Sequence, residues 1–340
     1  MGWGIMFAVM TWNLENLERP AANAAEIVKD RYARKLKQIS ELITMAEPDL
    51  VGVQEVLASP GDLTPRVFDD LRDALGAEWN GSLSQRPDDR GIRVAWLSKG
   101  QLTNPTDVAA YPQGVPATTI DDHGTQITAS KRGALAVIYT RADGLQVHAL
   151  AAHLKSKLLT FSGHDPQHSR FDTHDEGERA RVGLYALNQR AAEAATVRAW
   201  ATDQLQDQGQ QRHVLVCGDL NDTPEAATTQ LLLGRPGSQL GTGGFNQPDW
   251  GDGNRLWNLA PKMPAGDPVT GEEAANWSRI NNGVKELIDQ ILVSHLLVHA
   301  LDSTESLPLE GIKSATADPA SLAHMDAPSD HRPVIARFNL

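Results

Sequence analysis

The segment His213-Val-Leu-Val-Cys-Gly-Asp-Leu-Asn221 is an apolar run that ends in an aspartate and an asparagine. The aliphatic and β-branched residues at its start are typical of a strand that is buried on both faces. Asp219 and Asn221 are two residues apart, so they project from the same side of an extended chain. Polar groups at the ends of buried strands gather ligand sites in α/β proteins. This segment therefore predicts a core strand with a functional site at its end.

The same pattern, an apolar strand that ends in a carboxylate, a carboxamide or an imidazole, occurs five more times in the chain. Each instance has a simpler explanation by itself: Asp219 with Asn221 suits an Asx-type turn, and an isolated histidine such as His153 more often belongs to the core. Independent turn preferences would not place four acids, two carboxamides and two imidazoles at successive strand ends, so we interpret the set as one site. The other five ends carry Asn13 and Glu15, Gln54 and Glu55, His153 and Lys155, Asp289, and Asp330 and His331.

Apolar runs and helical periodicity alternate along the whole chain, which indicates a mixed α/β fold. In the first predicted helix, apolar residues from Ile27 onward recur at helical spacing until Pro48 stops the pattern. Its basic residues, expected on the solvent face, are Arg31, Arg34, Lys35 and Lys37. The predicted helices cover 25–46, 65–75 and 176–205, and the predicted strands cover 7–14, 50–56, 92–97, 135–140, 145–152, 213–217, 288–293 and 333–338.

Two long segments, at about 157–175 and 234–283, interrupt this alternation. Long irregular segments in a compact domain are functional loops or disordered regions. The same strand-end chemistry lies on both sides of each segment, so neither is interpreted as an interdomain linker. We therefore expect a single domain over residues 1–340 with elaborated loops.

The composition excludes several classes of protein. With 340 residues, 41% of them hydrophobic, the chain is long enough to bury a sizeable core. A formal net charge of −12 argues against holding nucleic acid by bulk attraction to phosphates, but it allows a small metal-assisted site. Cys217 is the only cysteine, which excludes an internal disulfide and a four-cysteine zinc site. The single cysteine suits a reducing compartment, and no apolar run approaches the roughly 18 residues of a membrane helix, so we expect a soluble, cytoplasmic protein. We also expect a monomer.

Taken together and in order, the strand-end motifs resemble those of the endonuclease/exonuclease/phosphatase superfamily, the deoxyribonuclease I-like metal-dependent phosphoesterases. The resemblance spans residues 11–334. It implies an α/β (α+β) four-layer sandwich, in which two mixed β-sheets pack face to face with helices on both outer faces. Periodicity alone does not distinguish this from a doubly wound single sheet. The motifs are Thr-Trp-Asn13, Gln-Glu55, His153-Leu-Lys155, Gly-Asp219-Leu-Asn221, Ile-Asp289 and Ser-Asp330-His331.

The residue types at the strand ends favour a hard metal ion. Oxygen ligands without thiolates suit Mg²⁺ or Mn²⁺ better than zinc. Glu55 is the best candidate ligand, supported by Asn13 and by Glu15 or Asp330. The resemblance implies the same assignment for Glu55 and Asn13.

The other site residues suit hydrolysis of a phosphoester. Asp219 would orient or deprotonate the attacking water, and the Asn221 amide would contact a phosphate oxygen. His331 would bind the scissile phosphate as an imidazolium stabilised by Asp289. His153 would be a second phosphate donor or the general acid for the leaving group.

Substrate contacts are less sharply indicated. We take Lys155 and Arg170 as candidates, since each lies near site residues or in the first irregular segment. His164 and His168 in the same segment have i, i+4 spacing, but Pro166 argues against a helix that would pair them as zinc ligands. The tryptophans of the second segment, expected beneath the loop more often than stacked on bases, are Trp250, Trp257 and Trp277.

We therefore predict a divalent-metal-dependent phosphodiesterase that hydrolyses nucleic acid. A phosphomonoesterase or phospholipase-like hydrolase, acting on a small-molecule or lipid phosphate, is the first alternative. A noncatalytic binding module is the second, and it is disfavoured because a pure binding surface does not need the full set of acids, carboxamides and histidines.

Overall fold

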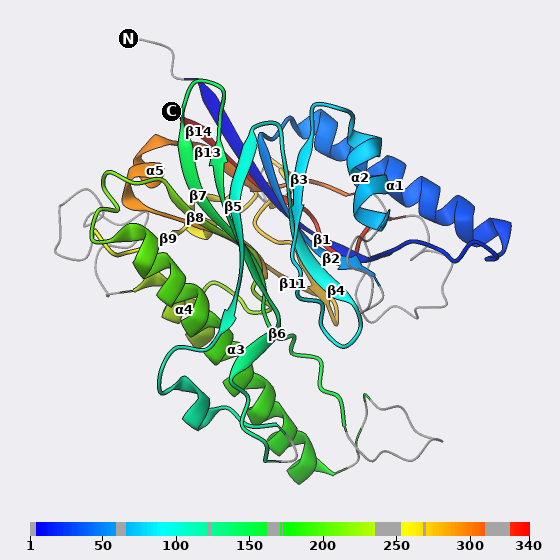
Figure 1. Ribbon diagram of the computed structural model, residues 1–340, viewed down its shortest axis with the longest axis vertical. Helices are drawn as coiled ribbons and strands as arrows, with labels where there is room; N and C mark the ends of the chain where they lie inside the picture. The colour runs from blue at the N-terminus through cyan, green and yellow to red at the C-terminus, as the bar shows by residue number, and fades with distance from the viewer. Residues whose placement is uncertain are drawn as a thin grey trace.

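Two mixed sheets lie face to face in the computed structural model (Figure 1). It describes residues 5–58, 66–121, 124–161, 171, 173, 175–234, 253–267, 270–309 and 327–340. Pairing is parallel between β1 and β2 and between β7 and β8, and antiparallel between the other neighbours of the two sheets. The first sheet has the order β13 (Leu301–Ser306), β14 (Val334–Asn339), β1 (Met6–Glu18), β2 (Leu50–Leu57), β4 (Ile92–Ser98) and β3 (Asn80–Leu83). The second has the order β5 (Gln101–Ala110), β6 (Ala129–Thr140), β7 (Gln146–His153), β8 (Val214–Asp219), β12 (Asp289–Val293) and β9 (Trp257–Asn258).

Helices cover the outer face of each sheet. Helices α1 (Glu26–Ala46) and α2 (Arg66–Leu75) share an apolar core with the first sheet. Helices α3 (Glu176–Leu205) and α4 (Ala227–Leu233) share another with the second sheet. A third core fills the space between the sheets. The predicted four-layer sandwich is confirmed, and Figure 1 shows the helix pairs on opposite sides of the strands.

The first helix differs from its prediction at two residues. Ile27 was expected on the apolar stripe but is 53% exposed, because only the second half of α1 packs on the sheet. Lys35 was expected in solvent, yet it is partly buried and its Nζ donates to the Glu15 carbonyl oxygen at 2.6 Å. The inner face of α1 therefore carries a cation to the end of β1.

The two sheets are joined across their interface by Trp96 of β4. Its indole is fully buried, and Nε1 donates to the Leu135 carbonyl oxygen of β6 at 2.9 Å. Gly52 of β2 allows this close approach, because a Cβ there would lie 3.0 Å from the Cys217 Sγ and 3.1 Å from the Trp96 ring. The lone cysteine thus has a packing position between the sheets.

Trp96 is expected to be a large single contributor to stability. Trp96→Ala should lower the free energy of unfolding by about 3–5 kcal/mol, since it leaves a cavity between the sheets. Trp96→Phe keeps most of the apolar volume and should cost about 1–3 kcal/mol, because the Leu135 carbonyl loses its donor. Urea unfolding followed by circular dichroism measures both values. A loss below about 1 kcal/mol for the alanine variant would contradict this account of the interface.

Parts of both predicted loops lie outside the described residues, among them Arg170, His164, His168 and Trp250. In the second segment the structure places β9 and a two-stranded hairpin of β10 (Arg279–Asn281) and β11 (Val284–Glu286). Trp257 and Trp277 are each 3% exposed, so both belong to the core. Within the described ranges, no helix has the length and apolarity needed to cross a bilayer. The monomeric state, the cytoplasmic location and the single domain stay predictions.

Candidate active site

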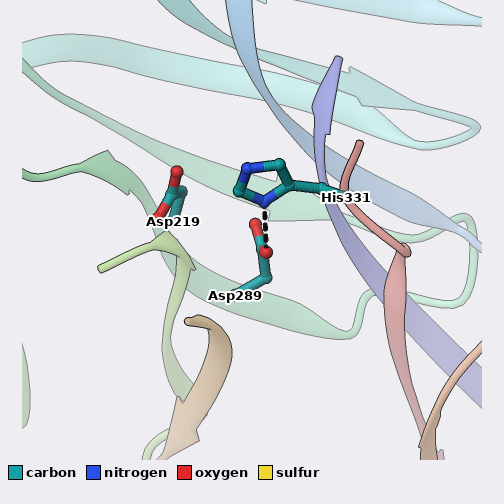
Figure 2. Close-up of side chains that lie close together, drawn as sticks. All are labelled: Asp219, Asp289 and His331. Atoms are coloured by element: carbon teal, nitrogen blue, oxygen red, sulfur yellow. Dashed lines mark hydrogen bonds and ion pairs between the residues drawn. The ribbon is translucent and has the colours of Figure 1, made fainter. Parts of the chain in front are cut away.

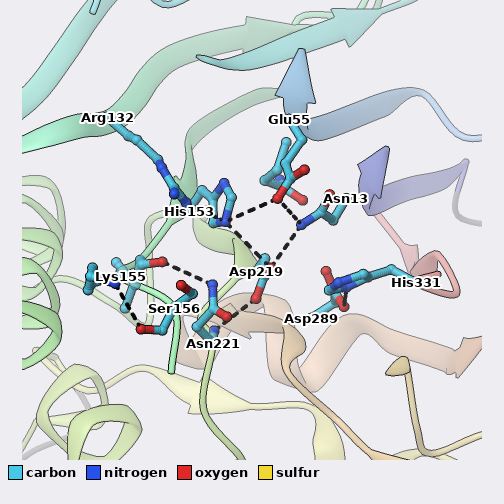
Figure 3. Close-up of polar contacts among 12 residues, drawn as sticks. Asn13, Glu55, Arg132, His153, Lys155, Ser156, Asp219, Asn221, Asp289 and His331 are labelled. Atoms are coloured by element: carbon cyan, nitrogen blue, oxygen red, sulfur yellow. Dashed lines mark hydrogen bonds and ion pairs between the residues drawn. The ribbon is translucent and has the colours of Figure 1, made fainter. Parts of the chain in front are cut away.

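The predicted site residues meet where strands of both sheets end. Three of them are neighbours in register on the second sheet: His153 of β7 lies opposite Asp219 of β8, which lies opposite Asp289 of β12. The first sheet brings Asn13 of β1 and Glu55 of β2 to the same place. Figure 3 shows these side chains converging from strands that are far apart in the sequence. The packing of one sheet on the other therefore assembles the site.

An irregularity in the pairing of β1 with β2 orients Glu55, the predicted metal ligand, and the residues beside it. The pairing register shifts after Asn13, and three residues around the shift have left-handed backbone: Glu15 (φ 45°), Asn16 (φ 51°) and Glu55 (φ 62°). Such conformations are unfavourable for residues with a Cβ and cluster at functional sites. The Asn16 amide donates to the Glu55 Oε2 at 2.8 Å, which holds that carboxylate in place.

A polar network joins the two sheets at the centre of the site (Figure 3). The Asn13 Nδ2 donates to the Asp219 Oδ2 at 2.9 Å and, at 3.4 Å, to the Glu55 Oε1. The His153 Nε2 lies 3.6 Å from the Asp219 Oδ2 and 3.9 Å from the Glu55 Oε1. The Asn13 Oδ1 accepts from the Glu15 amide at 2.9 Å, which fixes the orientation of the carboxamide. Its nitrogen can therefore hold the carboxylates of Asp219 and Glu55 near each other.

His153 is held as a neutral base by an arginine that the sequence did not single out. The Arg132 Nη1 lies 2.7 Å from the His153 Nε2, and a guanidinium can only donate, so Nε2 is the acceptor. Burial, followed by the charge of Arg132, holds the pKa of His153 well below its usual range. The His153 Nδ1 is buried without a hydrogen-bond partner in the described structure. In this arrangement Nε2 has no proton to give to a leaving group.

The second histidine, His331, is paired with a carboxylate instead, and Figure 2 shows its contact with Asp289. The His331 Nδ1 lies 2.7 Å from the Asp289 Oδ2, and both side chains are buried. Burial alone would lower the pKa of His331, but the carboxylates of Asp289 and Asp330 outweigh it and raise that pKa to about 10. The backbone is fixed as well, since the Trp12 indole donates to the His331 carbonyl oxygen at 2.8 Å. His331 is therefore an imidazolium at neutral pH.

Asp219 lies between these two halves of the site. Burial, and then the charge of Asp289, raises its pKa to about 6, while His331 and Asn13 act in the other direction. Its Oδ1 accepts from the Asn221 amide at 2.8 Å, which fixes the carboxylate. A carboxyl group with this pKa is suited to taking a proton near neutral pH.

Three predicted phosphate contacts do not face the centre or are not described. The Asn221 Nδ2, expected on a phosphate oxygen, donates to the Leu154 carbonyl oxygen at 3.0 Å. The Lys155 Nζ donates to the carbonyl oxygens of Ser156 at 3.2 Å and Leu158 at 3.3 Å. Arg170 lies outside the described residues. Asn221 and Lys155 thus stabilise the loop after β7.

Two sets of side chains could hold a metal ion. Asp219, Asp289 and His331 offer ligand atoms within 4.8 Å of one another, and the Asp289 Oδ1 is buried with no donor among the described residues. His331, however, has its Nδ1 on the Asp289 carboxylate, so only its Nε2 is left to face an ion. The second is centred on the Glu55 carboxylate; the predicted ligand Asn13 turns its Nδ2 toward Glu55, and its Oδ1 accepts from the Glu15 amide.

Several charged residues at the site were not among the predicted site residues. Arg132 follows two other polar residues at the start of β6, and Arg279 lies in a segment without periodicity. Arg90 reaches across from the loop before β4, with its Nη2 2.7 Å from the Asn16 Oδ1. Lys35 was hidden among the other basic residues of α1. Only the packing of separate elements brings these cations to the strand ends.

Comparisons with known proteins agree with this fold. A model of the Endonuclease/Exonuclease/phosphatase family matches residues 10–331. No curated protein matches the chain. Among solved structures, TDP2 from C. elegans is 17% identical with a TM-score of 0.53, over 98% of this chain and 75% of that one. The human Nocturnin catalytic domain with bound sulfate is 16% identical (TM-score 0.53; 98% and 94% covered), and a mannosyl-6-phosphatase from Bacteroides thetaiotaomicron is 14% identical (0.53; 97% and 98%).

Proposed function

The chain belongs to the endonuclease/exonuclease/phosphatase family, whose members are phosphoester hydrolases, and we propose that it is a metal-dependent phosphodiesterase that cleaves nucleic acid. The reaction is attack of a water on phosphorus, in line with the leaving oxygen. Transfer of this kind depends mainly on positioning and on stabilising the charge of the transition state. The site residues supply both.

The observation that carries the choice of a diester is the hollow space on both sides of the site. A pocket of about 460 Å³ lies between the end of β1 and α1, and Asn16, Arg31 and Lys35 are among its lining residues. A second pocket of about 240 Å³ adjoins His153 on the other side and is lined in part by Arg132. A phosphodiester continues on both sides of its phosphorus, whereas a monoester needs room on only one.

The residues around Glu55 fit a hard divalent cation. Its carboxylate is held by the Asn16 amide and the Asn13 carboxamide, and nearby the Glu15 Oε2 accepts from the Asp330 amide at 2.8 Å. Mg²⁺ or Mn²⁺ suits such a set, which contains no thiolate. When bound, the cation would neutralise charge on the phosphoryl oxygens and polarise the phosphorus.

The protein's own side chains have different roles in the reaction, and their charge states decide which role each can take. Asp219, held by Asn13 and the Asn221 amide, accepts a proton from the attacking water. The imidazolium of His331, fixed by Asp289, donates to a nonbridging oxygen of the phosphate. His153 is neutral, and its Nε2 accepts from Arg132, which places that guanidinium beside the site.

One observation favours the alternative, a phosphatase that acts on a small or lipid phosphate. The basic residues beside His153 are already neutralised: Lys131 pairs with Asp89, and Arg132 donates to Asp88 at 2.8 Å. A net charge of −12 also weakens any long-range attraction to a polynucleotide. The mannosyl-6-phosphatase of the same fold is a precedent for this second choice.

A substrate panel tests the proposal. Purified protein in Mg²⁺ or Mn²⁺ is given single-stranded DNA, duplex DNA, RNA, bis(p-nitrophenyl) phosphate and p-nitrophenyl phosphate. We expect diester and oligonucleotide cleavage that is abolished by EDTA and restored by excess metal. Hydrolysis of the monoester alone would favour the alternative, and cleavage that persists in EDTA would contradict the metal assignment.

A further inference from the structure

The segment that carries Arg279 is hydrogen-bonded to the backbone at both Asp289 and His331. Its backbone forms an antiparallel bridge with His331. The preceding Ser278 accepts hydrogen bonds at its Oγ from the Ile288 and Asp289 amides, at 3.1 and 3.0 Å. The start of β10 is therefore placed by the same backbone segments that place the phosphate-binding histidine.

Among the described residues, one ion pair anchors the Arg279 guanidinium. Its Nη2 lies 3.2 Å from the Asp330 Oδ2, and the side chain is 29% exposed. The Nε is buried and has no hydrogen-bond partner among the residues that the structure describes. A buried donor without an acceptor is costly, so it indicates a group that completes the site when it binds.

The charges around Arg279 are those of the active site itself. Burial alone would lower its pKa, but four carboxylates outweigh burial and raise it above the usual range. The guanidinium is therefore always charged, and it neutralises part of a cluster that would otherwise repel a phosphate. The four carboxylates are those of Asp330, Asp219, Asp289 and Glu55.

We propose that Arg279 is a catalytic residue that donates hydrogen bonds to a nonbridging oxygen of the scissile phosphate, beside His331. The inference rests on the proposed function, because it names a further group for the same hydrolysis. A planar guanidinium matches two oxygens of a phosphoryl group and keeps its proton throughout. The bond from the water oxygen to phosphorus forms and the bond to the leaving oxygen breaks, while Arg279 stabilises the charge on the oxygens between them.

The competing explanation is that Arg279 only positions Asp330. The chain offers a matched control for this: Arg337 is 26% exposed and has one ion pair, with its Nη1 3.3 Å from the Glu305 Oε1. Arg337 lies on β14 opposite Ala8 of β1, away from the strand ends that form the site. The same substitution at both arginines separates loss of an ion pair from loss of a substrate contact.

The experiment measures hydrolysis of bis(p-nitrophenyl) phosphate in Mn²⁺ by variants whose thermal melting shows that they are folded. Arg279→Ala should lower kcat by about 10²–10³-fold, as loss of a preorganised donor to transition-state charge does. Arg279→Lys should recover part of the rate, because it restores the charge but not the planar fork. Millimolar guanidinium should raise the rate of Arg279→Ala at least ~5-fold. Arg337→Ala should stay within about twofold of the wild type and show no such response.

The same substitution in Asp330→Asn protein distinguishes a substrate contact by Arg279 from mere positioning of Asp330. If Arg279 touches substrate, Arg279→Ala should cost at least ~10-fold even in Asp330→Asn protein, where no ion pair can be lost. No further loss there, or a wild-type rate for Arg279→Lys or Arg279→Ala, would overturn the inference. A wild-type protein that hydrolyses none of the phosphoesters would overturn the proposed function instead. If the alanine variant does not fold, the lysine variant decides.

Discussion

Asp219→Asn is expected to lower kcat by about 10³-fold, near the middle of the range for a lost proton-transfer group. The amide keeps the shape of the side chain, but its single oxygen can accept from only one of the two donors, the Asn13 Nδ2 and the Asn221 amide. It cannot accept a proton from the attacking water. Hydrolysis of bis(p-nitrophenyl) phosphate under saturating metal measures the loss, and a near-normal rate in folded protein would refute the assignment.

The pH dependence gives this prediction a second readout. The pKa of Asp219 is raised to about 6 by burial and then by Asp289, so the ionised base is depleted below that pH. The wild-type rate should therefore rise with pH through about 6, and the residual rate of Asp219→Asn should lack this rise. Asp49→Asn is the matched control, because Asp49 accepts from the Ala8 amide at the opposite end of the sheet.

The same shift predicts that the inactive variant stays folded. A carboxyl group whose pKa is higher in the folded state stabilises the fold at low pH, and that contribution is lost as the pH rises through about 6. At pH 7 the wild type therefore holds a buried charge at some cost. Asp219→Asn removes this charge but gives up one accepted hydrogen bond, so its melting temperature at pH 7 should stay close to that of the wild type.

The central strands were predictable because they are buried on both faces, and apolar runs mark such strands directly. The edge strands were not. In β5 most residues are partly or fully exposed, and Asn104 has a left-handed φ of 53° next to Pro105, which breaks the alternation. In β13 the sequence Leu-Asp-Ser-Thr-Glu-Ser is polar because it lies at the outer edge of its sheet. Burial, not pairing itself, is what the sequence pattern records.

The residues of the site also fall into a group that the sequence predicted and a group that it did not. Its strand-end residues were recognisable because the residue type and the strand came together in one local motif. Arg132 and Arg279 belong to no such motif, because the place of each depends on another strand: the Arg132 side chain meets His153, and the Arg279 backbone pairs with His331. Which side chain reaches which partner depends on register, and register between distant strands is set by the packed sheets.

His331→Ala should cost about as much as the loss of Asp219, on the order of 10²–10⁴ in kcat, and its pairing with Asp289 makes a sharper claim testable. If Asp289 acts by holding His331 charged, Asp289→Asn should lower the rate in wild-type protein but change it by less than about threefold in His331→Ala protein. Equal losses in both backgrounds would show an independent role for Asp289.

The alkaline side of the pH profile tests the same pair by a different route. The carboxylates of Asp289 and Asp330, against the effect of burial, raise the pKa of His331 to about 10, so the wild type should keep its activity until the pH approaches that value. Asp289→Asn removes the principal opposing charge, and burial then lowers the pKa of His331. Activity should consequently be lost at a lower pH in this variant, whereas an unchanged alkaline limb would contradict the assignment of His331 as the charged phosphate ligand.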